Sequence, residues 1–170
     1  PGLSDIEKRL REIPLDKTKT ADIDLSMFYH AETLGEIVSL KEYLQERRAT
    51  GKEDDLDGWI RMVATTRLTG HSPGFFSVYT LPPNQAVSRD SQKKINTKRN
   101  QVPGYKDVKG LILKKSRQLI RGITPLEFEH IAKYGDHGVF LNQDARHTAR
   151  ISDNAIALTV TSPPFLDIVQ

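Results

Sequence analysis

The hydrophobic pattern of the first 135 residues is helical. Apolar side chains recur every three or four positions, which places them on one face of a helix, and glycines, prolines or capping residues bound each stretch. The clearest stretch is followed by Gly51, where a glycine that ends a helix belongs. The pattern predicts helices over residues 3–13, 30–49, 53–70, 88–101, 107–121 and 124–135.

Capping residues support the predicted starts of three of these helices. Ser4 with Glu7, and Thr124 with Glu127, have the spacing of a capping box, in which each side chain bonds a free backbone N–H of the first turn. Asp107 precedes the fifth helix in the N-cap position. We therefore expect Ser4, Asp107 and Thr124 to cap their helices.

Residues 69–88 break the helical pattern. They contain two glycines, three prolines and three aromatic residues with no clear period, which indicates an ordered loop. Aromatic side chains gathered between such breakers either fill a core or line a site. We favour the first interpretation and keep the second open.

Two short apolar runs near the C-terminus are typical of strands. Residues 139–141 and 156–160 are rich in β-branched and apolar side chains and are bounded by turn residues, as in strands buried on both faces of a parallel sheet. The chain is therefore predicted to be α/β. A mainly helical region, residues 1–135, is followed by part of a parallel Rossmann-like sheet in residues 136–170.

Composition describes a polar globular protein. The chain has 170 residues, of which 37% are hydrophobic and 28% are charged, which is enough for one domain with a core. It has no run long enough to span a bilayer and no signal-peptide pattern, so we expect a cytoplasmic protein. The absence of cysteine excludes disulfides and thiolate zinc sites, and the spacing of the five histidines leads us to expect no metal site.

Positive charge is concentrated in one part of the chain. The net charge is only +3, yet residues 93–121 carry ten basic side chains against the single acid Asp107. Such a segment faces either solvent, as a polar helical surface, or a polyanion such as nucleic acid. The candidate phosphate-binding residues are Lys93, Lys94, Lys98, Arg99, Lys114, Lys115 and Arg117.

The sequence Ser162-Pro163-Pro164-Phe165 follows the second predicted strand. If residues 156–160 are an inner parallel strand, this tetrapeptide lies at the carboxyl end of the sheet, where α/β proteins bind ligands. Consecutive prolines fix the backbone and therefore the direction of its carbonyl groups. Rigid carbonyls beside a hydroxyl and an aromatic ring can hold a planar group that carries an amino function, although a stiff surface loop has the same composition.

The stretch DNAIALTVTSPPF, residues 153–165, resembles the catalytic motif of the amino-group DNA methyltransferases, which modify cytosine N4 or adenine N6. The upstream NQDAR, residues 142–146, is similar to the acidic turn of this family, with Gln143 where glycine is usual. Residues 59–88 also resemble a helical segment of a bacterial group of DNA methylases. The resemblance thus implies a DNA methyltransferase.

The resemblance also implies roles for individual residues. Ser162 and the carbonyl of Pro163 would accept hydrogen bonds from the target amino group, with Pro164 completing the rigid turn. Phe165 would stack on a base flipped out of the duplex. Asp144 would lie near the adenosine end of the cofactor S-adenosylmethionine. Serine in the first position is more typical of the N4-cytosine members.

The chain departs from the family in lacking a Gly-x-Gly turn for the cofactor, its nearest pair being Gly135 and Gly138. We therefore expect a fragment of a methyltransferase that neither binds S-adenosylmethionine nor turns over by itself. An unpaired strand at residues 156–160 would favour a homodimer or strand exchange through that sheet edge.

Two other functions stay open. The chain can be a non-enzymatic nucleic-acid-binding module, in which residues 93–121 bind phosphate and the tetrapeptide is only a loop. The same motif can also methylate RNA or a protein amide, and the basic segment favours nucleic acid over protein. DNA is thus the partner that we expect, and no membrane association is expected.

Overall fold

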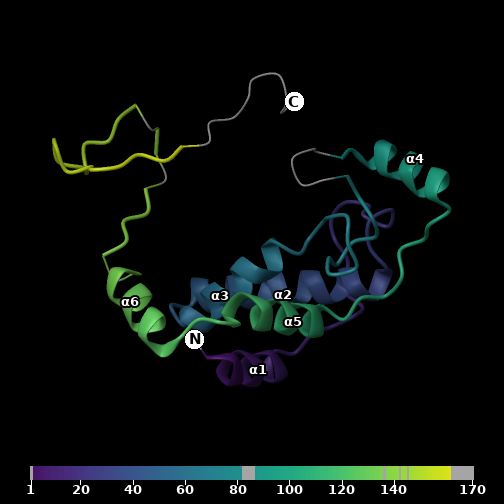
Figure 1. Ribbon diagram of the computed structural model, residues 1–170. Helices are drawn as coiled ribbons and strands as arrows, with labels where there is room; N and C mark the ends of the chain where they lie inside the picture. The colour runs from purple at the N-terminus through teal and green to yellow at the C-terminus, as the bar shows by residue number, and fades with distance from the viewer. Residues whose placement is uncertain (1, 82–86, 136, 142, 145, 162–170) are drawn as a thin grey trace. The chain divides into compact units, whose positions relative to one another are not determined.

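The computed structural model describes residues 2–81, 87–135, 137–141, 143–144 and 146–161. The chain divides into two compact units, residues 1–121 and 122–170 (Figure 1). In its described residues, the first unit contains five helices: α1 (Leu3–Glu12), α2 (Ala31–Ala49), α3 (Asp55–Thr65), α4 (Arg89–Arg99) and α5 (Val108–Ile120). The second contains α6 (Pro125–Gly135).

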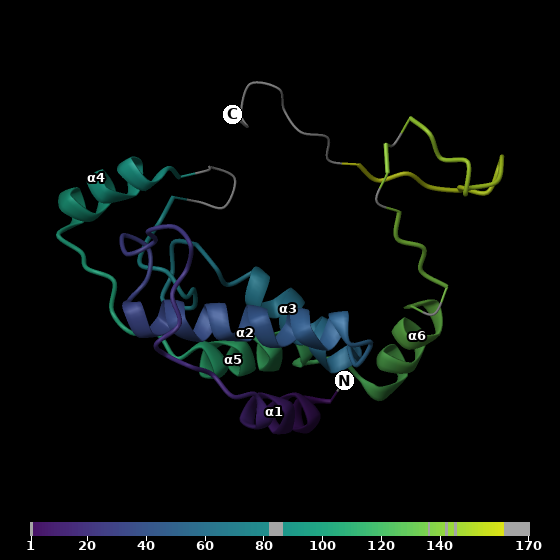
Figure 2. The same cartoon turned by 180° about the vertical axis from the view of Figure 1, so that it is seen from behind.

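The core of the first unit lies where α1, α2 and α3 pack against α5. Side chains at helical spacing supply it, because residues three or four positions apart share a face. Ile13, loop residues 27–29 and Phe76 complete the core, whereas α4 lies away from these four helices, with loops between (Figures 1 and 2). The buried core residues on the helices are Ile6, Leu10, Leu40, Leu44, Ile60, Val63, Val108 and Ile112.

Buried polar groups fix the start of α5 against α2. The carboxylate of Glu36, which is buried, accepts hydrogen bonds from the Val108 backbone N–H at 3.1 Å and from the Tyr105 hydroxyl at 2.8 Å. A negative charge is favourable there because the N-terminus of a helix has free N–H groups and a positive dipole end. The buried Thr33 hydroxyl also accepts a hydrogen bond from the Lys106 backbone N–H at 2.7 Å. These bonds set where α5 begins.

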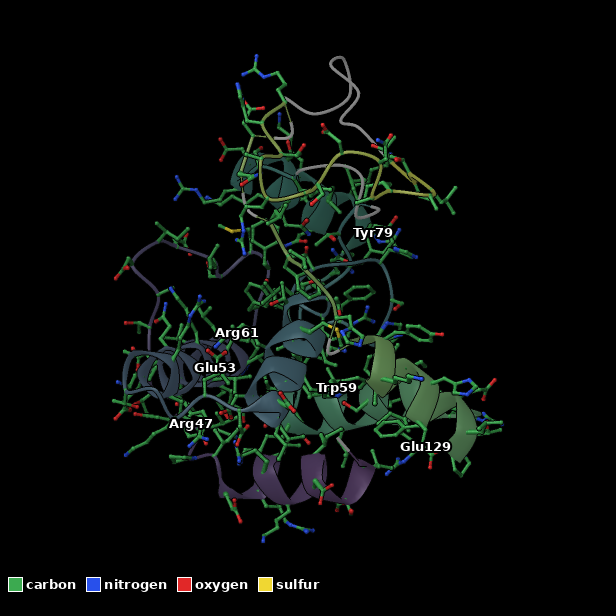
Figure 3. The ribbon with its side chains drawn as sticks, turned by 90° about the vertical axis from the view of Figure 1, so that its left-hand side faces the viewer. Arg47, Glu53, Trp59, Arg61, Tyr79 and Glu129 are labelled. Atoms are coloured by element: carbon green, nitrogen blue, oxygen red, sulfur yellow. The ribbon has the colours of Figure 1, made fainter. Side chains whose placement is uncertain are left out.

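An ion-pair cluster joins α1, α2 and the start of α3. Asp57 is 0% exposed, and its carboxylate lies 2.6 Å from Arg9 Nη1 and 2.5 Å from Arg47 Nε. Asp54, the N-cap of α3, also pairs with Arg9 at 2.6 Å. Figure 3 shows Arg47 on the same side of the unit as Glu53 and Arg61, which form a separate ion pair. A buried carboxylate with two guanidinium partners is fully compensated.

The predicted helices are confirmed, with corrections at their ends. Gly2, not Ser4, is the N-cap of α1, and the Asp5 carboxylate accepts its backbone N–H at 3.3 Å. The third helix ends at Thr65, ahead of the predicted stop at Gly70. Asp107 caps α5 as predicted, and Thr124 and Glu127 form the predicted reciprocal bonds at the start of α6.

The predicted α/β fold with a parallel Rossmann-like sheet is wrong. In the described residues the structure is helical, and its β-type pairing is an isolated bridge between Gly70 and Tyr79. Residues 139–141 and 156–160 form no strand, and Phe140 is 94% exposed. A strand requires neighbours for its backbone groups, and a β-rich composition alone does not supply them. The predicted dimer through a sheet edge at residues 156–160 loses its basis for the same reason.

In the part of the chain that the structure describes, no helix combines the length and the hydropathy needed to cross a membrane.

Candidate nucleic-acid interface

Helix α4 is attached to the rest of the first unit chiefly through amide side chains. Its sequence is strongly polar, and Gln92 is its buried residue. Ser88 caps the start, where its hydroxyl oxygen accepts the Ser91 backbone N–H at 3.2 Å. The helix ends at Asn100, which has the left-handed conformation with φ of 49°. Asparagine tolerates this conformation better than most residues, so both ends of α4 follow from its sequence.

The amide cluster consists of Gln92, Asn96 and Gln101. Gln92 and Gln101 donate to the carbonyl oxygen of Tyr79 at 2.9 and 3.0 Å. Asn96 donates to the carbonyl oxygen of Met27 at 2.8 Å, and its own side-chain oxygen accepts from both glutamines at 2.7 and 2.8 Å. These bonds hold α4 and the segment after it against two loops of the unit.

The four predicted cationic residues of α4, Lys93, Lys94, Lys98 and Arg99, are all exposed. Arg99 differs from the lysines because its guanidinium carbon lies 3.7 Å from the centroid of the Tyr79 ring. Figure 3 shows Tyr79 apart from the ion-pair cluster around Arg47. A cation over the face of an aromatic ring is held by the ring quadrupole. Helix α4 thus presents four positively charged side chains, and the Tyr79 ring fixes the position of one of them, Arg99.

The cations of α5 are on a different helix of the bundle. Lys114 and Arg117 are exposed and Lys115 is half-buried. Lys109, which belongs to the same basic segment, donates to the carbonyl oxygen of Ile13 at 2.6 Å and so links α5 to the end of α1. The close packing of α5 is with α1, α2 and α3. The cations of the basic segment are therefore divided between α4 and α5, and one of them, Lys109, stabilises the packing of the helices.

The aromatic loop before α4, residues 69–88, contributes one side chain to the core and others to an open pocket. Phe76 is buried in the core, and the ring of Phe75 lies against Gly70 so closely that a Cβ at that position would overlap it. The Arg67 guanidinium carbon lies 4.3 Å from the centroid of the Phe75 ring. Arg67 and Phe75 both line a pocket of about 710 Å³. Both interpretations of this loop, a filled core and a lined site, thus have support.

The residues assigned to methyl transfer are only partly within the described structure. Ser162, Pro163, Pro164 and Phe165 lie outside the described residues. Asp144 is exposed in the second unit, and its carboxylate pairs with Arg146 Nη2 at 2.5 Å. Hydrogen bonds from the Arg146 side chain and backbone lower the pKa of Asp144. Its charge is therefore already compensated by a neighbour two residues away.

In the described residues, the position that the resemblance assigns to S-adenosylmethionine is Asp144. Asp144 is paired with Arg146, and the sequence has no Gly-x-Gly turn to approach a cofactor closely. Within the same described ranges, no three histidine, aspartate or glutamate side chains gather in a way that could hold a metal ion. The exposed lysine and arginine side chains of α4 can bind an anion.

Sequence reasoning missed Arg67 and the contact between Arg99 and Tyr79. Arg67 lies just after α3 and outside the basic segment, so its charge did not stand out. A useful signal is an arginine next to a loop rich in aromatic residues, with no acid within the same loop. Arginine is the cation that stacks best on such rings.

Comparison of the chain with protein-family models, with curated proteins and with solved structures found no match.

Proposed function

We propose that the chain is a part of an S-adenosylmethionine-dependent DNA amino methyltransferase, and that its first unit contacts the DNA. The resemblance of residues 153–165 to the methyltransferase motif supports the first statement. The observation that carries the second is the set of exposed cations on α4, with the Arg99 guanidinium over the Tyr79 ring.

Phosphate contacts dominate the affinity of proteins for DNA. Each contact from lysine or arginine releases condensed counterions, so the affinity falls as salt rises. Lys93, Lys94 and Lys98 have no described ion pair that would compete with phosphate. Because α4 contributes little to the apolar core, its charged face is free of packing demands.

Methyl transfer itself is proposed from the resemblance alone. Ser162 and the Pro163 carbonyl would accept hydrogen bonds from the amino group, and Phe165 would stack on the base. Since residues 162–165 lie outside the described part of the chain, we derive no step of the transfer from the structure.

The second candidate is a nucleic-acid-binding module without enzymatic activity. The observation that favours it is the absence of a strand at residues 156–160 in the described structure. Without that strand, nothing places residues 162–165 at the edge of a sheet. Both candidates require the same DNA-binding surface.

The binding test measures the affinity of the chain for a fluorescein-labelled DNA duplex at several salt concentrations. We expect K93Q/K94Q/K98Q to lower the affinity and to reduce the slope of log affinity against log salt by about 0.9 for each phosphate that the variant no longer neutralises. The control K8Q/K41Q/K52Q removes the same charge from exposed lysines on other helices and loops. Equal reductions of affinity in the two variants would contradict a binding surface on α4.

The activity test uses the full product of the gene that encodes this sequence. Transfer of a tritiated methyl group from S-adenosylmethionine to DNA is compared between this protein and its F165A variant. Transfer that F165A abolishes supports the methyltransferase proposal. DNA binding without any transfer favours the module.

A further inference from the structure

Arg67 differs from the other half-buried arginines of the first unit. Burial of a charged group is unfavourable unless a partner compensates it. Arg9 and Arg47 share the carboxylates of Asp54 and Asp57, and Arg61 pairs with Glu53. Among the residues that the structure describes, Arg67 has no carboxylate partner.

The guanidinium of Arg67 is held in place by an aromatic ring. Its carbon lies 4.3 Å from the centroid of Phe75, and its Nε donates weakly to the Thr66 hydroxyl at 3.4 Å. Apart from the weak Nε bond to Thr66, the guanidinium N–H groups have no hydrogen-bond acceptor among the described residues, so they remain for a ligand. Partial burial lowers the pKa of Arg67, which reflects a positive charge removed from water without compensation.

The pocket beside Arg67 has room for a nucleotide. Its volume is about 710 Å³, which is within the range of small-molecule sites. Leu25, Phe28 and Val87 contribute an apolar wall, and the polar part of the lining consists of threonines, Tyr29 and Arg67, which is its one charged residue. The Tyr29 hydroxyl already donates to the Leu68 carbonyl oxygen at 3.1 Å. An apolar wall with one cation suits a ligand that has a flat ring at one end and an anion at the other.

We propose that this pocket binds a nucleotide, with the phosphate on the edge of the Arg67 guanidinium and the base against the apolar wall. The inference rests on the proposed contact between the chain and DNA, and it names a second binding element besides α4. The nucleotide belongs to a DNA strand or is free in solution, and the two sources share the same chemistry.

The test is a calorimetric titration of the whole chain with four probes: dCMP, dAMP, deoxycytidine and a 12-nucleotide single strand. We expect the phosphate-bearing probes to bind and deoxycytidine to bind about tenfold more weakly or not at all, because charge-assisted hydrogen bonds to phosphate supply much of the affinity. Binding of the strand without the mononucleotides assigns the pocket to DNA if R67Q weakens that binding, and assigns the strand to α4 and overturns the inference if R67Q does not. Binding of the mononucleotides assigns it to free nucleotides as well.

Variants of Arg67 separate the pocket from general charge effects. R67Q should weaken binding of the phosphate probes about tenfold or more, whereas R67K keeps the charge and should fall between R67Q and the unchanged chain. The control R11Q removes an exposed arginine of α1 and should change the affinity less than about twofold. Thermal unfolding of each variant shows that the comparison is made between folded proteins.

The outcomes distinguish this inference from the proposed function. If R67Q binds every phosphate probe as tightly as R11Q does, the inference is overturned, and DNA binding through α4 is judged by its own test. If R67Q no longer binds mononucleotides while the α4 variant binds duplex normally, the pocket is supported and the α4 surface is not. If deoxycytidine binds as well as dCMP, Arg67 is not a phosphate ligand.

Discussion

The guanidinium carbon of Arg99 lies 3.7 Å from the centroid of the Tyr79 ring, so the last residue of α4 is stacked on the loop that precedes this helix. The same loop contains Phe75, on which Arg67 is stacked at 4.3 Å. An arginine that precedes the loop and another at the end of the following helix thus each cover one aromatic ring of the loop. This arrangement fixes two positive charges without neutralising them.

Arg99 and Tyr79 should affect DNA binding in different ways. R99Q removes a charge, so it should reduce the salt slope by about 0.9 if Arg99 contacts one phosphate. Y79L keeps the charge but removes the ring, so it should weaken binding only about two- to fivefold, in line with an exposed cation–π contact, with no change of slope. Fluorescence anisotropy with a labelled duplex at several salt concentrations measures both quantities. A lower slope in Y79L would show that Arg99 needs the ring to reach phosphate.

Among the carboxylates of the first unit, Asp57 should contribute most to the free energy of unfolding. It is fully buried between Arg9 and Arg47, and D57N leaves both guanidinium groups without this charge. We expect a decrease of about 3 kcal/mol in the free energy of unfolding, measured by urea denaturation with the fluorescence of Trp59. The control D55N changes an exposed residue in the first turn of the same helix. Similar decreases in D57N and D55N would argue against the buried pair.

The stability of the first unit should fall in acid in a way that depends on Asp54. A hydrogen bond from Arg9 is the main reason that the pKa of Asp54 is lowered from 3.8 to about 2. Because the folded pKa is the lower one, the contribution of Asp54 is present above about pH 4 and disappears as the pH falls towards 2. D54N should be less stable than the unchanged chain at pH 7 and lose less stability between pH 4 and 2. Urea denaturation across this range measures both, and parallel curves would contradict the assignment.

Gly35 and Gly58 are matched glycines with opposite predicted effects. A Cβ at Gly35 in α2 would overlap the backbone carbonyl of Lys17, whereas nothing lies within 4 Å of a Cβ at Gly58 in α3. G35A should therefore destabilise the chain by at least about 1 kcal/mol, in the range of overpacked sites. G58A should stabilise it by about 0.5–1 kcal/mol, because alanine is the better helix former. Thermal unfolding of the two variants tests the close approach of α2 to the backbone at Lys17, in the loop between α1 and α2.

Helices could be predicted from the sequence because their hydrogen bonds are local. The apolar spacing in residues 30–49 and the cap at Asp107 each depend on neighbours within four positions, and both are confirmed. The strand predicted at residues 156–160 depends on partners elsewhere in the chain, and its composition carried no information about them. The cap of α1 shifted from Ser4 to Gly2 because Asp5 offers a carboxylate to the free N–H of Gly2.

The candidate site was predictable in its charges but not in its arrangement. The basic composition of residues 93–121 indicated an exposed surface, and the lysines of α4 are exposed. That Lys109 binds the carbonyl of Ile13, and that Arg67 lies over Phe75, depends on contacts between distant elements. Such contacts produce no periodic pattern of residues from which they could be predicted.

The hydrogen bonds that attach α4 determine which substitutions the helix tolerates. Gln92, Asn96 and Gln101 attach α4 mainly to backbone carbonyls, and a carbonyl is present whatever the side chain of its residue. Substitutions on the outer face of α4 therefore leave these bonds intact. The exposed side chains of α4 can therefore be exchanged, and the surface that the helix presents altered, without loss of its attachment to the two loops.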